Sequence, residues 1–538
     1  MSIESIMGDL LVHAPAMIIA IPLLGAFLTP IISRINGTLR NVFVISIMGL
    51  TSLFVGVLAN DIFTSRVIKT YVFGGSQELT SPVVRILLEI DALSMFMAMI
   101  VLIVAFVAVI YSWGFMKEYT GLDKYYTLVL LMTAGMFGMV LTGDLFNFFV
   151  FLEITSIASC ALIAFWTTKG ESIEAAFKYI VISAIGALFV LFAIAILYGQ
   201  YNALNIATLA SVMKYTFLDK VALVLLVGAL AMKAGIVPMH MWLPDSYGRA
   251  PASVTLILVG ATQASLYGVF RVCFTLYGKS LSLTNNILGL EDGFPLALGT
   301  SLGILVVLLA IVTMLVGVFM ALKQSDFKRL IGFAAVAEIG YMMLGLGVAL
   351  LSIEPTGLSG SGLMALKGGI FHIFNDALDI GLMFLVAGAV YWATKERSLD
   401  KLGGLARNMK YTSIFFVIGL FAVAGMPPFN GFASKLLIYE SVFQISPILS
   451  IVAILSSIML LAVFVKVFHS VFLGPAIPKF KNVKEAPISL LVAMIIISVL
   501  IVFIGIFPEM FLNNIVGPAT DALVNYSGYI DAVVLGGM

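Results

Sequence analysis

Apolar runs long enough to cross a membrane recur from one end of this chain to the other. The hydrocarbon core of a bilayer is about 30 Å thick, and a helix needs about 20 apolar residues to span it. Fourteen such runs can be marked, at 12–33, 41–59, 91–114, 125–143, 145–167, 173–198, 219–247, 252–277, 295–322, 329–351, 363–392, 411–440, 447–472 and 487–511. Charged residues make up 11% of the chain, against about 25% in soluble proteins. The pattern predicts an all-α polytopic protein in which residues 1–538 form a single integral membrane domain.

The loops between these runs differ in basic charge. Eighteen Lys and Arg residues fall in loops on one side, and six fall on the side of the N-terminus. Because inside loops are enriched in Lys and Arg, the N-terminal side is predicted to be outside. An even number of spans then places the C-terminus outside as well. The start MSIESIMGDL lacks a basic flank and a cleavage site, so the first span is expected to be retained. In the outside loop 60–90, YVFGG indicates a small hairpin.

Two spans are interrupted by Gly and Pro, and each also contains a lysine. The first reads ALAMKAGIVPMHMWLPD and contains Lys233; the second reads FAVAGMPPFNGFASKLLIYE and contains Lys435. A charge at the bilayer centre costs about 3 kcal/mol, so such residues usually line ion pathways. Interrupted spans in corresponding halves of a transporter indicate its working site. The two segments therefore predict discontinuous helices at an ion path.

The two interruptions lie about 200 residues apart, in the seventh and twelfth spans. Grouping five spans around each one gives two units, 125–277 and 295–472. A unit with an odd number of spans reverses the membrane orientation of the next unit. The chain is therefore predicted to contain two inverted five-helix repeats, an arrangement found in many transporters.

Glu153 lies in the middle of the fifth span and is a natural partner for Lys233. A lone carboxylate in hydrocarbon is expected to be neutral, whereas a cationic partner keeps it charged. A lysine that alternately pairs with Glu153 and stands alone would bind and release a proton. The alternatives are a static ion pair that orients helices and a lysine that snorkels to the interface.

A second group of polar residues lies in the eleventh span. His372, Asp376 and Asp379 are spaced by four and three, which places them within about 60° on one helical face. This stripe predicts a hydrated interior path, and a hydrogen-bonded structural cluster is the alternative. Glu338, mid-span in AAVAEIGYMM, fits a path or packing equally well.

Other polar residues give weaker indications. Gln263 could hold water inside the eighth span, and His240 could relay protons or cap the broken helix. Arg271, Lys466 and His469 lie near span ends and are expected to snorkel.

No cofactor or metal site is visible in the sequence. The four histidines are far apart and unpaired, and Gly357, Gly360 and Gly362 do not form a phosphate-binding motif. A net charge of +1 gives no reason to propose nucleic acid as a partner.

Five motifs in order, GDLFNFFVFLE, KAGIVPMHMWLPDSYGRAPASV, LKQSDFKRLIGFAAVAEIGYM, FHIFNDAL and AGMPPFNGFASK, resemble a known family. This family consists of the antiporter-like membrane subunits shared by complex I, Mrp-type cation/proton antiporters and membrane-bound hydrogenases. The form NGFASKLLIY is most similar to the Mrp D-type and hydrogenase-related branches. The resemblance implies a large antiporter-like subunit of a membrane-bound hydrogenase or related archaeal or bacterial oxidoreductase, in a prokaryotic plasma membrane.

The resemblance also implies roles for individual residues and for partners. Glu153 and Lys233 would be the acid–lysine pair of the first half, and Lys435 the charged residue at the far end of a central proton path. Other membrane and peripheral subunits would surround the chain. They would hold Fe–S clusters, and a Ni–Fe centre in a hydrogenase, while this chain holds no cofactor.

Two departures from the family pattern concern the middle of this path. Gln263 stands where many members have a lysine, and Ile257 where some have a histidine. Ile380, beside Asp379, stands where some members have a lysine, and Asp376 replaces the usual histidine. Carboxylates thus take the place of bases, and their charge favours cations, including Na⁺.

Three functions follow as hypotheses. The first is a proton-translocating subunit of a redox-driven, ion-pumping complex, which has no active site of its own. The second is a core subunit of a non-redox Mrp-type Na⁺/H⁺ antiporter. The third is a structural subunit whose ion path has decayed, for which Gln263 and Ile380 are the motivation.

Overall fold

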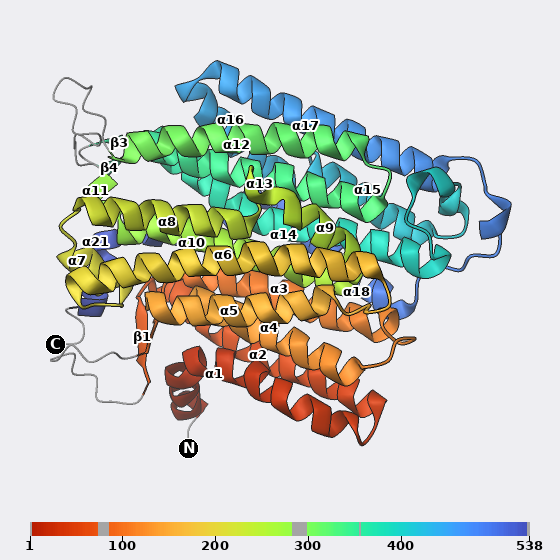
Figure 1. Cartoon of the computed structure of the whole chain (residues 1–538), viewed down its shortest axis with the longest axis horizontal. Helices are drawn as coiled ribbons and strands as arrows, with labels where there is room; N and C mark the ends of the chain where they lie inside the picture. Colours follow the sequence, from red (N-terminus) through yellow and green to blue (C-terminus); the bar gives the residue numbers. More distant parts are fainter. Residues whose placement is uncertain (1–2, 74–85, 282–297, 355–356, 535–538) are drawn as a thin grey trace.

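The structure is a computed structural model that describes residues 3–73, 86–281, 298–354 and 357–534. Long helices lie side by side in one elongated bundle, and most connections gather at its two ends (Figure 1). Within the described residues, thirteen helices are long and apolar enough to cross a membrane. The all-α polytopic fold is therefore confirmed. The total of fourteen spans, the side on which the termini lie and the two inverted repeats stay predictions.

The helices follow the predicted apolar runs closely. The first half contains α1 (Ile3–Ser33), α2 (Gly37–Ser65), α3 (Ala92–Phe115), α4 (Leu122–Leu141), α5 (Leu145–Ile163), α6 (Gly170–Tyr201), α7 (Ile206–Val212), α8 (Phe217–Ala234), α9 (Trp242–Arg249), α10 (Ala252–Arg271) and α11 (Gly278–Leu281). The second half contains α12 (Leu298–Lys323), α13 (Phe327–Leu351), α14 (Gly360–Thr394), α15 (Lys410–Val423), α16 (Asn430–Ile445), α17 (Pro447–Phe468) and α18 (Ile488–Ile506). Three short helices follow, α19 (Pro508–Phe511), α20 (Gly517–Val524) and α21 (Tyr526–Val534).

Helices α10, α13 and α14 form the centre of the bundle. Every residue in the most apolar stretch of α10 and of α14 is buried, as is 94% of that stretch in α13. In α2, α6, α17 and α18 the corresponding share is 33–39%, so these helices present their apolar side chains outward. Polar groups on the central helices lie far from lipid and water, and they need partners within the protein.

Both predicted interruptions are present. Helix α8 ends at Ala234, where Gly235 has φ +87°, and the chain resumes through a 3₁₀ turn (Met239–Met241) into α9. Helix α15 ends at Val423, Gly425 has φ +70°, and α16 begins at Asn430. Glycine adopts positive φ without steric cost, and proline cannot donate a backbone hydrogen bond. Each break makes a backbone carbonyl at the end of a helix available to a side-chain donor: Met232 accepts from Trp242 Nε1, and Val423 accepts from Lys435 Nζ.

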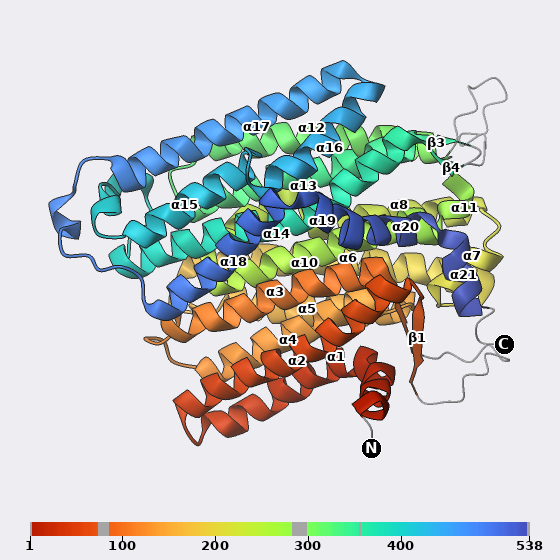
Figure 2. The same cartoon turned by 180° about the vertical axis from the view of Figure 1, so that it is seen from behind.

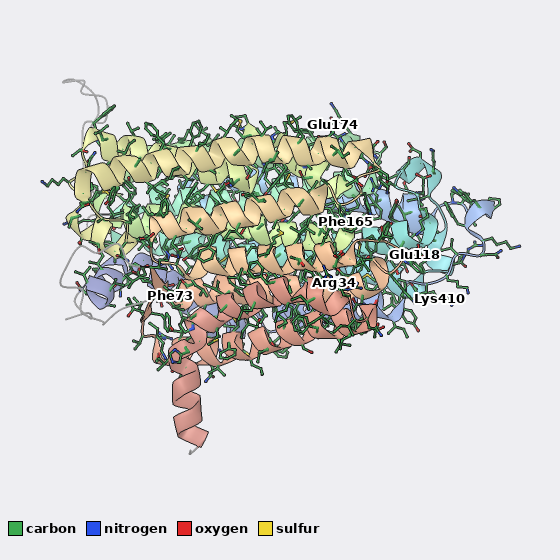
Figure 3. All side chains as sticks on the ribbon, turned by 60° about the horizontal axis from the view of Figure 1, so that its bottom comes forward. Arg34, Phe73, Glu118, Phe165, Glu174 and Lys410 are labelled. Carbon is green, nitrogen blue, oxygen red and sulfur yellow. The ribbon has the colours of Figure 1, made fainter. Side chains whose placement is uncertain are left out.

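The two ends of the bundle differ. The hairpin of β1 (Lys69–Val72) and β2 (Leu87–Ile90) lies at one end with α7 and α21 (Figures 1 and 2). A second short pair, β3 (Ile353–Glu354) and β4 (Gly357–Leu358), lies at the same end. The predicted hairpin in 60–90 is thus confirmed, although both glycines of YVFGG and the turn itself lie outside the described residues. Arg34, Glu118 and Lys410 mark the opposite end (Figure 3).

Candidate ion path

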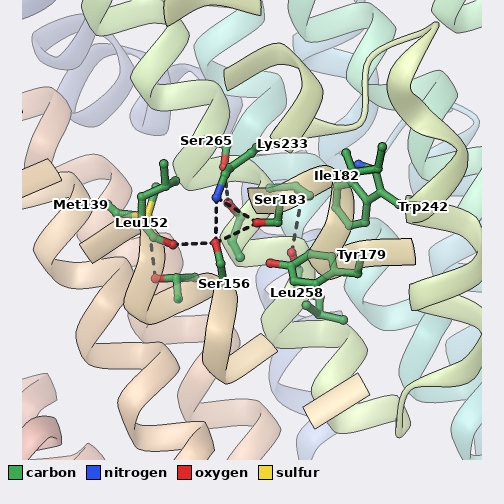
Figure 4. Close-up of a pocket in the computed structure, with 13 residues that line it drawn as sticks. Met139, Leu152, Ser156, Tyr179, Ile182, Ser183, Lys233, Trp242, Leu258 and Ser265 are labelled. Carbon is green, nitrogen blue, oxygen red and sulfur yellow. Dashed lines mark hydrogen bonds between the residues drawn. The ribbon is translucent and has the colours of Figure 1, made fainter. Parts of the chain in front are cut away.

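Lys233 occupies the last turn of α8, directly before the first break. Its Nζ donates hydrogen bonds to Ser156 Oγ on α5 at 2.7 Å and to Ser183 Oγ on α6 at 2.9 Å (Figure 4). The nearest Glu153 oxygen lies 3.7 Å from Nζ. The expected pairing of Glu153 with Lys233 is therefore present as a loose contact, while the two hydroxyls hold the ammonium more closely. An ammonium in the last turn also interacts favourably with the helix dipole.

Glu153 and Lys233 differ in exposure. The side chain of Lys233 is 5% exposed and that of Glu153 is 31% exposed on the surface of the chain. Glu153 Oε1 has no hydrogen-bond partner among the described residues. A carboxylate in this position can turn towards or away from the ammonium at little cost, because no second contact fixes it.

A cavity of about 20 Å³ lies beside Lys233 (Figure 4). Hydroxyl groups form much of its polar wall and come from several helices: Thr155, Ser156, Tyr179, Ser183, Thr262 and Ser265. A volume of this size is enough for about one water molecule with several polar partners. The cavity extends from Lys233 towards α10, which is one of the central helices.

Lys435 lies on α16 beyond the second break and is fully enclosed. Its Nζ donates to Glu338 Oε1 at 2.8 Å, to the backbone carbonyl of Val423 at 2.7 Å and to Ser457 Oγ at 3.2 Å. The side chains of Lys435 and Glu338 are 1% and 2% exposed. Val423 is the last residue of α15, so the break in the helix supplies one of the acceptors. A buried charge pair with good hydrogen bonds is tolerated where an isolated charge is not.

His372 continues this cluster on the other side of Glu338. Its Nε2 lies 2.8 Å from Glu338 Oε2, and its Nδ1 lies 3.0 Å from Ser434 Oγ. One carboxylate therefore contacts a lysine through one oxygen and a histidine through the other. Such an arrangement can exchange a proton between imidazole and carboxylate without exposing either group to lipid.

Asp376 and Asp379 lie further along the same face of α14. Gln263 Nε2 on α10 donates to Asp376 Oδ2 at 2.5 Å, and Asn430 lies within hydrogen-bond reach of Asp379. Asn430 Nδ2 also donates to Asn375 Oδ1 at 3.1 Å. One oxygen of each of these groups, Gln263 Oε1, Asp376 Oδ1, Asp379 Oδ1 and Asn430 Oδ1, is buried without a described donor. Protonating the two acids would supply the missing donors, and a small cation would satisfy the same oxygens.

The structure thus brings most of the predicted residues together, although their roles stay predictions. Glu338, His372 and Lys435 form one cluster, and Gln263 contacts Asp376. His240 stands apart from these clusters. Its buried ring lies 6.4 Å from the ring of Phe333, and its Nδ1 has no hydrogen-bond partner among the described residues.

The expectation that Arg271 snorkels to an interface is wrong. Its side chain is 4% exposed, and its two terminal nitrogens bind the carboxylate of Asp91 at 2.6 and 2.7 Å. Asp91 is the N-cap of α3, and its Oδ1 accepts the backbone N–H of Ser94. Arg271 lies near a span end, but α3 begins beside it and the ring centre of Tyr529 on α21 lies 5.1 Å from its guanidinium carbon, so the guanidinium cannot reach solvent.

Two further features were missed by sequence reasoning. Ser156 and Ser183 bind Lys233, yet hydroxyls scattered over apolar spans give no pattern in sequence. Lys328, counted among the basic loop residues, is buried at the start of α13, where Nζ donates to the carbonyl of Ala250 at 2.6 Å and to Thr255 Oγ1 at 3.0 Å. In the described part of the chain, no group of three or more His, Cys, Asp or Glu side chains could hold a metal ion.

Comparison with known proteins places these features in a family. The family described as "NADH:quinone oxidoreductase/Mrp antiporter, TM" matches residues 142–461. The N-terminal family described as "NADH-Ubiquinone oxidoreductase (complex I), chain 5 N-terminus" matches residues 80–126.

Individual relatives agree with this assignment. NADH-quinone oxidoreductase subunit N of Desulforudis audaxviator (strain MP104C) is 30% identical over 94% of this chain and 98% of that protein. Na⁺/H⁺ antiporter subunit A1 of Staphylococcus haemolyticus (strain JCSC1435) is 30% identical over 82% of this chain and 54% of that protein. A solved structure of the membrane-bound sulfane sulfur reductase, described as an archaeal respiratory membrane complex, contains a chain with a TM-score of 0.83. The sulfur reductase chain is 28% identical to this chain, and the structural match covers 97% of this chain and 100% of the sulfur reductase chain. The protein therefore belongs to the antiporter-like membrane subunits shared by NADH:quinone oxidoreductases and Mrp antiporters, and it is a multi-pass protein of the prokaryotic plasma membrane.

Proposed function

We propose that this chain is the proton-translocating subunit of a membrane-bound, redox-driven complex. The observation that supports this most is the pair of buried lysines at the two broken helices, Lys233 and Lys435. In the second half of the bundle, the buried side chains of Glu338 on α13 and His372 on α14 lie next to Lys435. Ionisable residues enclosed in a membrane bundle are costly and usually belong to ion pathways.

In the first half of the bundle, the distance between Glu153 and Lys233 can change, and this change controls the path. Lys233 keeps its proton while Glu153 is near, and it gives the proton up when the carboxylate turns away, because an unpaired ammonium is costly in a buried site. The proton then passes to water in the cavity lined by Thr262 and Ser265 on α10. A charge change in a neighbouring subunit at the exposed side of Glu153 would move the carboxylate.

The second half receives the proton on acids and a histidine. Gln263 fixes one oxygen of Asp376, which leaves the other oxygen to take a proton from the α10 side. His372 and Glu338 then pass the charge to Lys435. A proton arriving at Glu338 neutralises the carboxylate, which weakens the hold on the Lys435 ammonium and favours release of its proton.

The driving reaction takes place in other subunits. The relatives named above are subunits of respiratory and antiporter assemblies, and we infer that this chain also works inside a multi-subunit membrane complex. Fe–S clusters, and a Ni–Fe centre if the complex is a hydrogenase, are expected in its partners. Coupling between partners and the path is electrostatic, through Glu153.

A non-redox Na⁺/H⁺ antiporter subunit is the second candidate. It is supported by the likeness to antiporter subunit A1 and by the unpartnered oxygens of Asp376 and Asp379, which suit Na⁺ as well as protons. Mass spectrometry of the purified complex separates the two candidates. Fe–S subunits are expected for the redox complex, and their absence would favour the antiporter.

The ion path itself is tested by proton uptake into liposomes that contain the purified complex. Lys233→Ala and Lys435→Ala should each reduce proton transport at least tenfold, whereas Lys466→Ala, at an exposed lysine, should leave it unchanged. Full transport with both buried lysines replaced would instead support a structural subunit with a decayed path.

A further inference from the structure

A buried carboxylate outside the spans remains unexplained by the path described above. Glu89 on β2 is 1% exposed. Its two oxygens accept hydrogen bonds from Tyr529 Oη on α21 and from Asn205 Nδ2 at the start of α7. Asp144 and Arg271 are the charged groups that face it from the α4–α5 junction and from α10.

The surroundings of Glu89 place its titration in the physiological range. Burial raises the pKa of Glu89 to about 7; hydrogen bonds from Tyr529 and Asn205 and the charge of Arg271 oppose the rise, and Asp144 adds to it. Arg271 is already bound by Asp91, so it is not free to form an ion pair with Glu89.

A second cavity approaches this carboxylate from inside the bundle. It measures about 20 Å³ and lies between α4, α5, α6, α8 and α10, with Thr142, Tyr267 and Arg271 among its lining residues. Met139 lines both this cavity and the one beside Lys233. Both cavities therefore border the side chain of Met139.

The wall of the second cavity adjoins the contacts of Glu89 through Thr142 and Arg271. Thr142 lies next to Gly143, whose backbone packs so closely against the Glu89 carboxyl group that a Cβ there would clash with it. Arg271, also in the cavity wall, lies 5.1 Å from the ring centre of Tyr529, which donates to Glu89. Lys233, Met139, Thr142 and Glu89 thus follow one another from the bundle interior to its end.

We propose that Glu89 is a proton-binding site at the end of a second branch, which leaves Lys233 away from the central helices and passes Met139 to the face covered by α21. The branch rests on the proposed function of Lys233. A proton leaves the Lys233 ammonium for water in the first cavity, crosses to the second cavity, and protonates the Glu89 carboxylate. Overall, Lys233 loses one proton and Glu89 gains one, and the water that carries the proton is unchanged.

Met139 and the apolar second cavity beside it form the barrier of this branch. The second cavity is lined mainly by apolar side chains, and cavities with apolar walls stay dry. Dry constrictions stop ions and protons until they hydrate. Proton passage to Glu89 therefore requires water on both sides of Met139, which keeps the branch closed in the structure described.

Titration of Glu89 is measured by infrared spectroscopy of the intact complex, in the carboxylic-acid region, between pH 5 and 9. Glu89→Gln should remove a band that disappears near pH 7, while the matched control Glu354→Gln, an exposed acid on β3 at the same end, should retain it. Tyr529→Phe removes one donor from the ionised carboxylate and should move the inflection to higher pH. A band that is unchanged in both Glu89→Gln and Tyr529→Phe would overturn the proposal.

The branch is tested separately by passive proton leak into liposomes containing the complex. Met139→Ala joins the two cavities and should raise the leak several-fold, and adding Glu89→Gln should reverse at least half of the increase. A leak in Met139→Ala that Glu89→Gln does not alter would overturn the branch. Neither measurement depends on turnover, so a failure of the proposed pumping function would be seen separately.

Discussion

Lys435 and Glu338 meet across α16 and α13 with 2.8 Å between Nζ and Oε1, whereas Lys233 stands 3.7 Å from Glu153. The same residue types thus form a tight pair at one end of the path and a loose pair at the other. Both members of the tight pair are almost fully buried, and Glu153 of the loose pair is about one-third exposed. The loose pair is therefore the end that a neighbouring subunit can influence.

Removing one member of the tight pair should destabilise the protein. Glu338→Gln leaves the Lys435 ammonium buried without its anion, and breaking a buried ion pair in this way costs about 3–5 kcal/mol. Thermal unfolding in detergent should show a clear drop in midpoint, while Glu440→Gln, an exposed acid on the same helix α16, should show none. Adding Lys435→Met to Glu338→Gln should restore much of the loss. A double variant as unstable as the single one would contradict this account.

Ser156 and Ser183 should set how readily Lys233 transfers its proton, because both accept hydrogen bonds from its ammonium. Ser156→Ala and Ser183→Ala each remove a hydrogen bond to a charged group, worth about 1.5–3 kcal/mol. Each should reduce proton transport by roughly tenfold, and the double variant should approach Lys233→Ala. Ser211→Ala, at an exposed serine near the hairpin end, serves as the control. Wild-type rates in the double variant would mean that Glu153 alone holds the ammonium.

Gln263 should be needed to keep Asp376 in place. Gln263→Leu removes the donor at 2.5 Å from Asp376 Oδ2 and leaves a buried acid without its partner. Proton transport should fall strongly, whereas Gln263→Lys, which supplies a donor in the same place, should retain more activity than Gln263→Leu. Liposome transport assays measure both. Equal activity of wild type and Gln263→Leu would favour a decayed path.

Docking of α21 should weaken as the pH rises. Burial raises the pKa of Glu89 to about 7 from 4.5, so the docked state binds a proton that an undocked, hydrated carboxylate would release. This contribution is fully present below pH 4.5 and is lost as the pH rises through about 7. Hydrogen exchange of the α21 amides, corrected for the intrinsic rate, should therefore speed up as the pH rises from 4.5 to about 7 and should change no further above that pH. Glu89→Gln should remove this dependence, and a pH-independent wild type would refute it.

The general fold and the two lysine sites could be predicted from the sequence, because apolar runs, Gly–Pro interruptions and isolated charges are local signals. Lys233, Glu153 and Lys435 stand out for this reason. The contact of Lys435 with Glu338 could not be predicted, since the two residues are 97 positions apart and meet only when α13 packs against α16. The Glu153–Lys233 pair also joins distant helices, but Glu153 is the natural partner for Lys233 in the sequence, whereas Glu338 fits a path or packing equally well.

The sequence wrongly indicates exposed charges at Arg271 and at Lys328, and the two errors have the same cause. Arg271 and Lys328 lie near span ends, where position alone favours an exposed charge. Burial of Arg271 depends on the N-cap residue Asp91 and on Tyr529 of α21, and burial of Lys328 depends on the carbonyl of Ala250. In each case the acceptor comes from another segment that ends at the same level of the bundle.

The break in the helix at Val423 helps replace the water molecules that would otherwise hydrate the Lys435 ammonium. An ammonium has three N–H donors, and at Lys435 a carboxylate, a carbonyl and a hydroxyl each accept one of them. The protein has built the first hydration shell of the ion from its own atoms. At Lys233 two hydroxyls serve two donors and the third faces a carboxylate at 3.7 Å. One lysine is thus fully coordinated and the other incompletely so, and a proton leaves more readily from the ion whose shell is incomplete.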